Sequence, residues 1–260
     1  MIGAIAGDII GSVFEANPIK TTDFPLFSEG SRFTDDTVTT IAVAHAILYQ
    51  ADYAESLKTF GRMYPDAGYG GAFRNWIFSG QSIPYNSWGN GSAMRVCPVG
   101  FAFSTREAVL AHAEKSAAVS HNHPEGIKGA QAVALAVFLA RTGSTREEIR
   151  DTLSSRFGYD LDQTVAEIRP AYGFDVSCQG SVPQALVAFL DSTDYADAVR
   201  KAVSLGGDSD TQACIAGGIA EAYYRHIPGS ILQTVVSMLP PPLLSVYREF
   251  TARFSLACNV

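Results

Sequence analysis

Two short segments combine acidic residues with threonine immediately before an apolar run. The first is TDDT, residues 34–37, which precedes VTTIAVAHAILYQ. The second is DSDT, residues 208–211, which follows two glycines and precedes QACIAGGIAEAYY. Both patterns are typical of a helix N-terminus, where a side-chain oxygen caps a backbone N–H and an acid complements the helix dipole. Capping therefore explains either segment taken alone.

Metal binding is the alternative interpretation of the same segments. Adjacent carboxylates repel each other, and a bound Mg²⁺, Mn²⁺ or Ca²⁺ removes that cost. Neither segment contains a Cys or His, so the hard oxygen ligands suit these ions better than zinc. Two such segments in one chain favour a metal site, and their spacing fits a two-metal centre in which one carboxylate bridges both ions.

A further pair of acids lies in the apolar N-terminal segment. Asp8 and Glu15 are seven residues apart, so a helix over residues 2–16 would carry both on one face. Buried carboxylates are costly unless they are paired or bind metal. The pair therefore predicts a polar site inside the core, although exposure at the helix end is a fair alternative for Glu15.

Helical patterns dominate the rest of the chain, and no alternating strand pattern of useful length is present. Gly3, Gly7 and Gly11 recur every four residues and predict the close approach of a neighbouring helix. We expect an all-α fold, a single compact multi-helix domain over residues 1–260 with more helices than a four-helix bundle. The predicted helices cover residues 2–16, 35–50, 53–64, 69–79, 92–103, 105–119, 124–142, 145–157, 181–191, 194–204, 209–226 and 240–256.

Composition excludes several classes of protein. The 260 residues are 47% hydrophobic and 17% charged, which is enough to bury a core, and the net charge of -7 argues against a nucleic-acid surface. No apolar run is long enough to span a membrane, and the N-terminus lacks the basic start of a signal peptide. We expect a cytoplasmic protein with reduced thiols, because its cysteines lack disulfide or zinc spacing: Cys97, Cys178, Cys214 and Cys258.

The chain resembles the ADP-ribosylglycohydrolase family, which includes dinitrogenase reductase-activating glycohydrolase and the ADP-ribosyl-acceptor hydrolases. The resemblance runs through nearly the whole chain, and its motifs occur in the family's order. They are GAIAGDIIGSVFE (3–15), FTDDT (33–37), GYGGAFRNW (68–76), GNGSAMRVCPVG (89–100), SHNHPEGIKGAQA (120–132), SVPQAL (181–186) and GGDSDTQACIAGGIAEAYY (206–224).

The resemblance implies an all-α enzyme that binds two Mg²⁺ or Mn²⁺ ions and hydrolyses the bond between ADP-ribose and an acceptor. Glu15 matches a family glutamate near the metals and the scissile ribose, and Asp8 matches a residue to which we assign a structural role. The implied metal ligands are Thr34, Asp35, Asp36, Asp208, Asp210 and Thr211.

The substrate's diphosphate is negative, so in an acidic protein it needs neutral donors. The GNGS segment offers them through Gly89, Asn90, Gly91 and Ser92, because glycines let backbone N–H groups approach phosphate oxygens. An ordinary turn with a Ser92 cap is the alternative. The adenine needs a flat partner; His121 matches a family position at the adenosine end, and the other candidates, which are as readily core residues, are Tyr69, Phe73 and Trp76.

The expected reaction is hydrolysis of the C1″ glycosidic bond by a positioned water, through an oxocarbenium-like transition state. Glu15 is the first candidate for the acid or base and Asp36 the second. The expected partner is an ADP-ribosylated protein or small conjugate, and we expect a monomer. Two alternatives remain open: a non-catalytic ADP-ribose-binding or structural family member, and a two-metal phosphate-ester hydrolase. The sequence does not specify the acceptor or the choice between Mg²⁺ and Mn²⁺.

Overall fold

The structure is a computed structural model that describes residues 1–254. Its regular elements are all helices, and the described residues contain no strand beyond an isolated bridge between Gly89 and Ser177. The all-α prediction is thus confirmed. The helices are α1 (Ile2–Gly11), α2 (Asp35–Tyr49), α3 (Tyr53–Met63), α4 (Gly71–Phe78), α5 (Gly91–Met94), α6 (Cys97–Ala102), α7 (Arg106–Ala118), α8 (Pro124–Arg141), α9 (Arg146–Phe157), α10 (Val165–Ile168), α11 (Cys178–Leu190), α12 (Tyr195–Ser204), α13 (Ser209–Tyr224), α14 (Gly229–Met238) and α15 (Pro241–Arg253).

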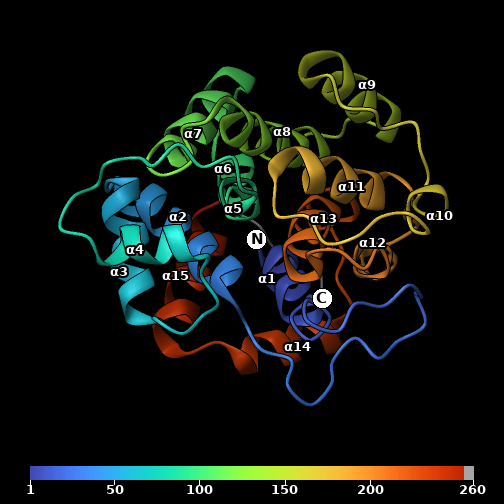
Figure 1. Cartoon of the computed structure of the whole chain (residues 1–260), viewed down its shortest axis with the longest axis horizontal. Helices are drawn as coiled ribbons and strands as arrows, with labels where there is room; N and C mark the ends of the chain where they lie inside the picture. Colours follow the sequence, from blue (N-terminus) through green and yellow to red (C-terminus); the bar gives the residue numbers. More distant parts are fainter. Residues whose placement is uncertain (255–260) are drawn as a thin grey trace.

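Helices α1 and α13 pack against each other at the centre of the molecule (Figure 1). Helices α2, α3, α4 and α15 lie on one side of this pair, and α11 and α12 lie on the other (Figure 1). Helix α8 packs on both α7 and α13. The acidic segments at the starts of α2 and α13 therefore both belong to helices that pack on α1.

The glycine stripe of α1 faces α13, as the sequence predicted. A Cβ atom on Gly7 would lie 2.0 Å from the carbonyl oxygen of Ala213, and one on Gly3 or Gly11 would lie 2.5 Å from main-chain oxygens of α13. Such distances leave no room for any side chain. The stripe lets the two backbones touch, and this close packing brings the end of α1 next to the start of α13.

Helix α1 ends at Gly11, five residues earlier than the predicted boundary at residue 16. The hydroxyl of Ser12 donates to the carbonyl of Ile9 and accepts from the backbone N–H of Arg32, and a turn follows between Gly11 and Phe14. Pro18 lies a few residues on and disfavours a longer helix. The prediction that Asp8 and Glu15 share one helix face is therefore wrong.

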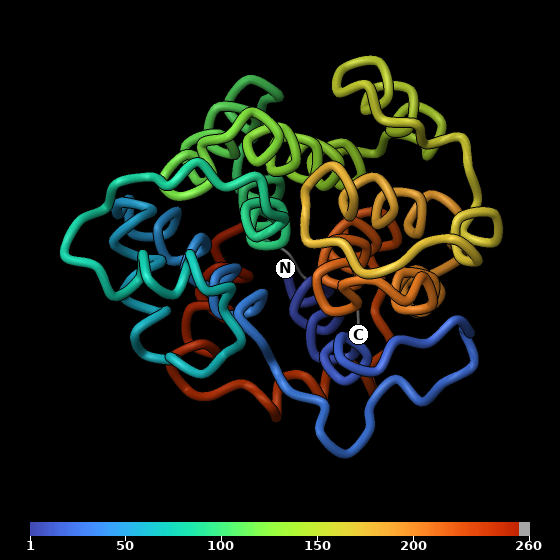
Figure 2. Tube along the Cα trace, viewed as in Figure 1, coloured from blue at the N-terminus to red at the C-terminus, as the bar shows by residue number. Residues whose placement is uncertain are grey.

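Residues 12–34 form a long connection that runs out past α12 and returns before α2 begins (Figure 2). Lys20 fastens this connection, because its ammonium donates to the carbonyls of Arg169 (3.0 Å), Tyr172 (2.6 Å) and Leu205. Leu205 immediately precedes the Gly206–Gly207 turn, so the same contact fixes the backbone that leads into α13.

Several other predicted elements differ from the structure; α11, for example, begins at Cys178 rather than at residue 181. The predicted helix 92–103 is two short helices, α5 and α6, because Pro98 cannot continue the hydrogen bonding of α5. Helices α10 and α14 were not predicted, and the last helix, predicted to residue 256, ends at Arg253. Residues 255–260, and with them Cys258, lie outside the described part of the chain.

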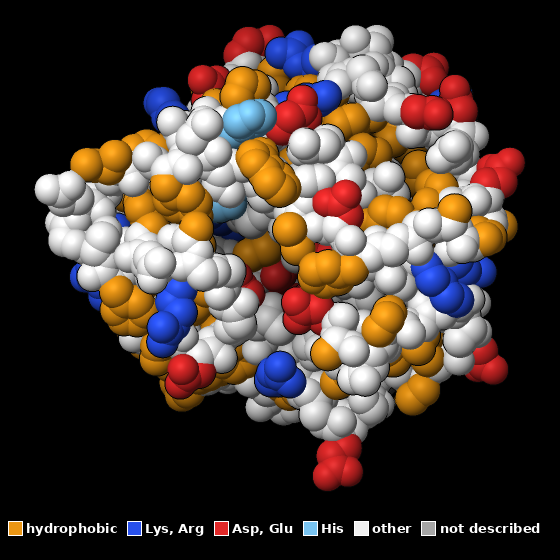
Figure 3. All heavy atoms as spheres, viewed as in Figure 1, with side chains coloured by type: hydrophobic (Ala, Val, Ile, Leu, Met, Phe, Trp, Pro, Cys, Tyr) orange, Lys and Arg blue, Asp and Glu red, His pale blue; other side chains and the backbone are white. Residues whose placement is uncertain are grey.

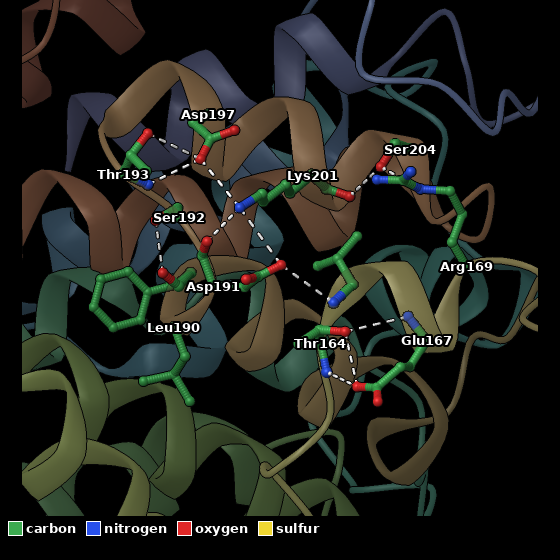
Figure 4. Close-up of polar contacts among 12 residues, drawn as sticks. Thr164, Glu167, Arg169, Leu190, Asp191, Ser192, Thr193, Asp197, Lys201 and Ser204 are labelled. Carbon is green, nitrogen blue, oxygen red and sulfur yellow. Dashed lines mark hydrogen bonds and ion pairs between the residues drawn. The ribbon is translucent and has the colours of Figure 1, made fainter.

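A polar network holds α10 against α11 and α12 (Figure 4). Lys201 forms ion pairs with Asp191 (3.5 Å) and Asp197 (3.2 Å), and Asp191 accepts the backbone N–H of Val165. Thr164 and Glu167 close a capping box around α10. These contacts, together with the burial of Val165 in the core, hold a helix as short as α10 in place.

The remaining expectations from composition concern thiols and membranes. Cys97, Cys178 and Cys214 are free and buried, which agrees with the prediction of reduced thiols. No helix within residues 1–254 combines the length and the apolarity that a bilayer crossing requires.

Candidate metal centre and substrate cleft

The starts of α2 and α13 meet at the floor of a cleft. Among the predicted metal ligands, Asp35, Asp36, Asp208, Asp210 and Thr211 all line this cleft. The hydroxyl of Thr211 lies 3.4 Å from Oδ2 of Asp36, which directly joins the two helix starts. Figure 3 shows acidic atoms at the bottom of a hollow near the centre of the viewed face.

Thr34 is the sixth predicted ligand, and it is the N-cap of α2. Its Oγ1 accepts the backbone N–H of Asp36 (3.3 Å) and donates to Oδ1 of Asp8 (2.6 Å). Oδ2 of Asp8 accepts the backbone N–H groups of Thr34 (2.9 Å) and Thr37 (3.0 Å) and the hydroxyl of Thr37. Asp8 thus acts as a second cap on α2, contributed by α1, and it holds the TDDT segment in place.

Asp36 has fewer and longer hydrogen bonds than Asp8, although both side chains are buried. Oδ2 of Asp36 has two long contacts, with the hydroxyls of Thr34 and Thr211, both at 3.4 Å. Oδ1 of Asp36 is buried and has no hydrogen-bond partner. A buried carboxylate oxygen without a partner is costly, so this atom requires a further ligand in the cleft.

The start of α13 supplies two more buried carboxylates. Oδ2 of Asp208 accepts from the side-chain amide of Asn90 at 2.7 Å, and Oδ1 of Asp210 accepts from the backbone N–H of Thr211 at 3.0 Å. Gly206 has a φ of +66°, which glycine adopts without strain, and this turn directs Asp208 into the cleft.

Electrostatic repulsion between these acids is strong. Burial, followed by the charges of neighbouring carboxylates, holds the pKa values of Asp35, Asp36 and Asp210 well above the usual range of aspartate. The pKa of Glu15 is also raised, first by burial and then by the charge of Asp208. The cluster therefore favours either protons or a cation at its centre.

The donor set fits a divalent metal. Carboxylate oxygens of Asp8, Asp36 and Asp210 lie within 4.8 Å of one another, and so do those of Glu15, Asp208 and Asp210. Asp210 belongs to both groups, as a bridging ligand would. The unpartnered Oδ1 of Asp36 and the all-oxygen chemistry suit Mg²⁺ or Mn²⁺, so the residues present fit the predicted ions.

Glu15 reaches the site from a turn after α1 rather than from the helix itself. It lines the cleft, and its carboxylate belongs to the group with Asp208 and Asp210. Glu15 thus lines the cleft, although its local structure differs from the predicted helix.

A wall of the same cleft carries most of the predicted substrate-binding residues. Gly89, Asn90, Gly91, Phe73 and His121 line it. A Cβ atom on Gly91 would lie 3.0 Å from Nε2 of His121, so glycine keeps that ring edge accessible.

Ser92 does not belong to this wall. Its side chain is fully buried and donates to the carbonyl of Gly126 at 2.7 Å, because α5 turns it away from the cleft. It is not an N-cap either, since Asn90 holds that position. The alternative of a turn capped by Ser92 is thus wrong, and any contribution of Ser92 to substrate binding would come from its backbone rather than from its hydroxyl.

The predicted aromatic partners form a stack that recedes from the cleft. Phe73 lines it, and Trp76 stacks on the far side of Phe73 with ring centroids 5.4 Å apart. Tyr69 lies 5.8 Å from Phe73 and is buried. Trp76 and Tyr69 support Phe73 rather than face the cleft.

Several residues of the cleft lining were not predicted as site residues, and Tyr85 and Arg95 are the largest of them. Tyr85 lines the cleft from a loop and forms a T-shaped contact with His121, whose ring centroid lies 5.9 Å from that of Tyr85. Arg95 also lines it, and among the described lining residues it is the one Arg or Lys. Arg95 lies within the quoted GNGSAMRVCPVG motif, so a signal for it was present in the sequence.

Comparisons with known proteins agree with this geometry. The family model described as ADP-ribosylglycohydrolase matches residues 1–254. The chain is 29% identical to ADP-ribosylhydrolase ARH3 of Mus musculus, over 90% of this chain and 85% of the relative, and 28% identical to ARH3 of Homo sapiens, over 86% and 84%. It is 25% identical to ADP-ribosylarginine hydrolase Tri1 of Pseudomonas putida, over 86% of this chain and 69% of the relative.

A solved structure titled ADP-ribosylglycohydrolase-related protein complex shares the fold. Its TM-score is 0.73 at 23% sequence identity, and the match covers 98% of this chain and 95% of that one. The chain belongs to the ADP-ribosylglycohydrolase family, and the predicted class of enzyme is confirmed at the level of that family.

Proposed function

We propose that this chain is a metal-dependent hydrolase that releases ADP-ribose from an ADP-ribosylated protein or small conjugate. The observation that carries the proposal is the meeting of Asp36, Asp208 and Asp210 in one cleft, with Oδ1 of Asp36 buried and unpartnered. Relatives also support the proposal, because proteins named ADP-ribosylhydrolase ARH3 and ADP-ribosylarginine hydrolase Tri1 match most of the chain.

In this proposal the metal ligands are Thr34, Asp35, Asp36, Asp208, Asp210 and Thr211, and the ions are two Mg²⁺ or Mn²⁺. When bound, such ions would lower the pKa of a coordinated water and hold ribose hydroxyls. Asp8 and Asn90 orient the ligands, since Asp8 caps the TDDT segment and Asn90 donates to Asp208.

Glu15 is the proposed acid or base. Its pKa is raised, first by burial, which brings it closer to the working range of a proton-transfer group. It lies at the cleft and is more exposed than Asp36, so it can exchange protons with water. An oxocarbenium-like transition state carries positive charge, which the surrounding carboxylates stabilise.

The wall formed by Gly89, Asn90, Gly91 and His121 is the proposed site of the rest of ADP-ribose, with Phe73 as an aromatic contact. The proposal includes neither a specific acceptor nor a preference between the two ions. A cytoplasmic monomer remains our expectation.

The test is product analysis with defined substrates. We would incubate the protein with ADP-ribosyl-arginine and ADP-ribosyl-serine peptides in Mg²⁺ or in EDTA, alongside Asp36→Ala. Exposed Glu29, which lies outside the cleft lining, provides the control variant Glu29→Ala. We expect free ADP-ribose in Mg²⁺, its loss in EDTA and in Asp36→Ala, and full release by Glu29→Ala.

Two outcomes would contradict the proposal. AMP or phosphate as the product would support a two-metal phosphate-ester hydrolase. ADP-ribose binding without release from either peptide or from a small conjugate would support a non-catalytic binding protein.

A further inference from the structure

A chain of hydrogen bonds runs from a buried arginine to the cleft. Nη2 of Arg95 donates to the carbonyl of Ser116 (2.7 Å) and to Oγ of Ser120 (3.0 Å). Oγ of Ser120 lies 2.8 Å from Nδ1 of His121. All three side chains are at least nine-tenths buried: Arg95 is 1% exposed, Ser120 0% and His121 4%.

The direction of these bonds follows from their donors. Arg95 carries only N–H groups, so Oγ of Ser120 accepts from it. The hydroxyl proton of Ser120 then needs an acceptor, and Nδ1 of His121 is the acceptor that the described residues provide. A buried hydroxyl without an acceptor would be costly. Nδ1 therefore accepts, and a neutral imidazole that accepts at Nδ1 carries its proton on Nε2.

Nε2 of His121 faces the cleft. Gly91 lies against this ring edge, with the site of a Cβ atom 3.0 Å from Nε2, and Gly89 is the next glycine of the same turn, with its own Cβ site at 3.7 Å. Among the described residues no hydrogen-bond partner is recorded for Nε2. His121 thus presents a single N–H donor to the cleft, next to a main chain that no side chain covers.

We propose that Arg95 and Ser120 are positioning residues that hold His121 in its Nε2–H tautomer, so that it donates to an acceptor atom of the ligand. The identity of that ligand rests on the proposed function, because we take it to be ADP-ribose. The tautomer itself does not depend on that assignment.

The surroundings explain the value of a fixed donor. The lining of the cleft carries five carboxylates, those of Glu15, Asp35, Asp36, Asp208 and Asp210. These groups accept hydrogen bonds, and they repel an anionic ligand. A histidine in the other tautomer would add one more acceptor at Nε2. The hydrogen bonds from Arg95 through Ser120 exclude that tautomer and leave the His121 ring neutral.

A purely structural role for Arg95 is the alternative that the experiment must distinguish. Arg95 also caps the C-terminal end of α7 through the carbonyl of Ser116, which would stabilise the helix whatever the state of His121. The hydroxyl of Ser116 offers a matched control, since it donates to the carbonyl of Ala113 and takes no part in the Arg95–Ser120–His121 hydrogen bonds. Ser116→Ala removes a buried hydroxyl and leaves the Arg95–Ser120–His121 contacts intact.

The direct test is a long-range ¹⁵N–¹H spectrum of the full chain labelled at histidine, recorded at neutral pH without ligand and assigned with His121→Gln. We expect the Nε2–H pattern for His121 in the wild type and in Ser116→Ala, and a mixture of both tautomers in Ser120→Ala. The Nδ1–H or the doubly protonated pattern in the wild type would overturn the proposal. So would an unchanged pattern in folded Ser120→Ala.

Titration calorimetry with ADP-ribose in Mg²⁺ supplies the second readout. One neutral hydrogen bond corresponds to a factor of about three to ten in affinity, so we expect Ser120→Ala to weaken binding by about that factor and Ser116→Ala to leave it unchanged. Equal affinities for both variants and the wild type would overturn the role in ligand binding. If the wild type binds no ADP-ribose, the proposed function fails, and the spectrum alone decides the tautomer.

Discussion

The hydroxyl of Thr211 and Oδ2 of Asp36 lie 3.4 Å apart, although 175 residues separate them in the chain. This contact joins the N-termini of α2 and α13, and within residues 1–254 no Lys or Arg forms an ion pair with the aspartates at these helix ends. Thr34 and Asp8 cap α2, whereas Asp36 keeps an unpartnered oxygen and Asp208, at the N-cap of α13, makes no capping hydrogen bond. Capping and metal binding are compatible here, because they use different side chains at the same two helix starts.

Asp36→Asn should separate stability from metal binding. It removes a buried charge from a group of like charges, so we expect the metal-free variant to be more stable than the wild type by about 1–3 kcal/mol at pH 7. Urea denaturation in EDTA measures this difference. Addition of Mg²⁺ should raise the Tm of the wild type and have little effect on the variant. A variant that is less stable in EDTA would show that Asp36 is not an electrostatic liability.

Asp8→Asn should have the opposite effect on stability. The carboxylate of Asp8 accepts from two backbone N–H groups and two hydroxyls, and an amide can accept at only one of its two side-chain atoms. We expect a loss of about 2–4 kcal/mol in the free energy of unfolding, together with weaker Mg²⁺ binding. Unchanged stability would contradict the role of Asp8 as a cap on α2.

Gly7→Ala tests the contact between α1 and α13. Its Cβ atom would meet the carbonyl of Ala213 at 2.0 Å, and backbone cannot move as a side chain can. We expect a loss of about 3 kcal/mol, measured by chemical denaturation. Gly80 has open space around its Cβ position, so Gly80→Ala should change stability by less than about 1 kcal/mol. Similar values for the two variants would refute the close packing.

The sequence was informative where the physical cause is local. The acids and threonines of TDDT and DSDT mark helix starts because capping needs only neighbouring residues, and both starts lie within one residue of the prediction. The spacing of Gly3, Gly7 and Gly11 likewise depends on the geometry of one helix. These two patterns predicted the helix starts that carry the candidate metal ligands and the close packing of α1 on α13.

Features that depend on contacts distant in sequence were not predictable. Helix α1 ends early because Ser12 finds a partner in Arg32, and Glu15 reaches the cleft only through the resulting turn. The Ser92 hydroxyl turns towards Gly126 for a similar reason. Helix α14 is a different case, because Ile231, Leu232 and Val235 follow a local helical spacing and the helix was predictable from the sequence.

His121 predicts a specific pH dependence of stability. Burial, followed by the charge of Arg95, holds its pKa well below the usual value of 6.5. The unfolded chain therefore binds a proton below about pH 6.5 that the folded chain does not. The contribution of neutral His121 to the free energy of unfolding is thus fully present above that pH and is lost as the pH falls. His121→Gln should reduce the loss of stability between about pH 6.5 and pH 5.

The control for this effect is His226→Gln, because His226 is exposed. Urea denaturation across the pH range should give parallel curves for His226→Gln and the wild type, and a flatter curve for His121→Gln. Three parallel curves would show that His121 is already protonated, or freely titrating, in the folded protein.

The most direct test of the metal centre is anomalous diffraction at the manganese edge, with crystals grown in MnCl₂ and ADP-ribose. We predict two peaks at the cleft floor, each about 2 Å from carboxylate oxygens, with Asp210 near both and Asp36 and Asp208 near one each. We also predict the terminal ribose of the bound ligand beside the peaks. Ordered ADP-ribose with no anomalous peak between the starts of α2 and α13 would contradict the account.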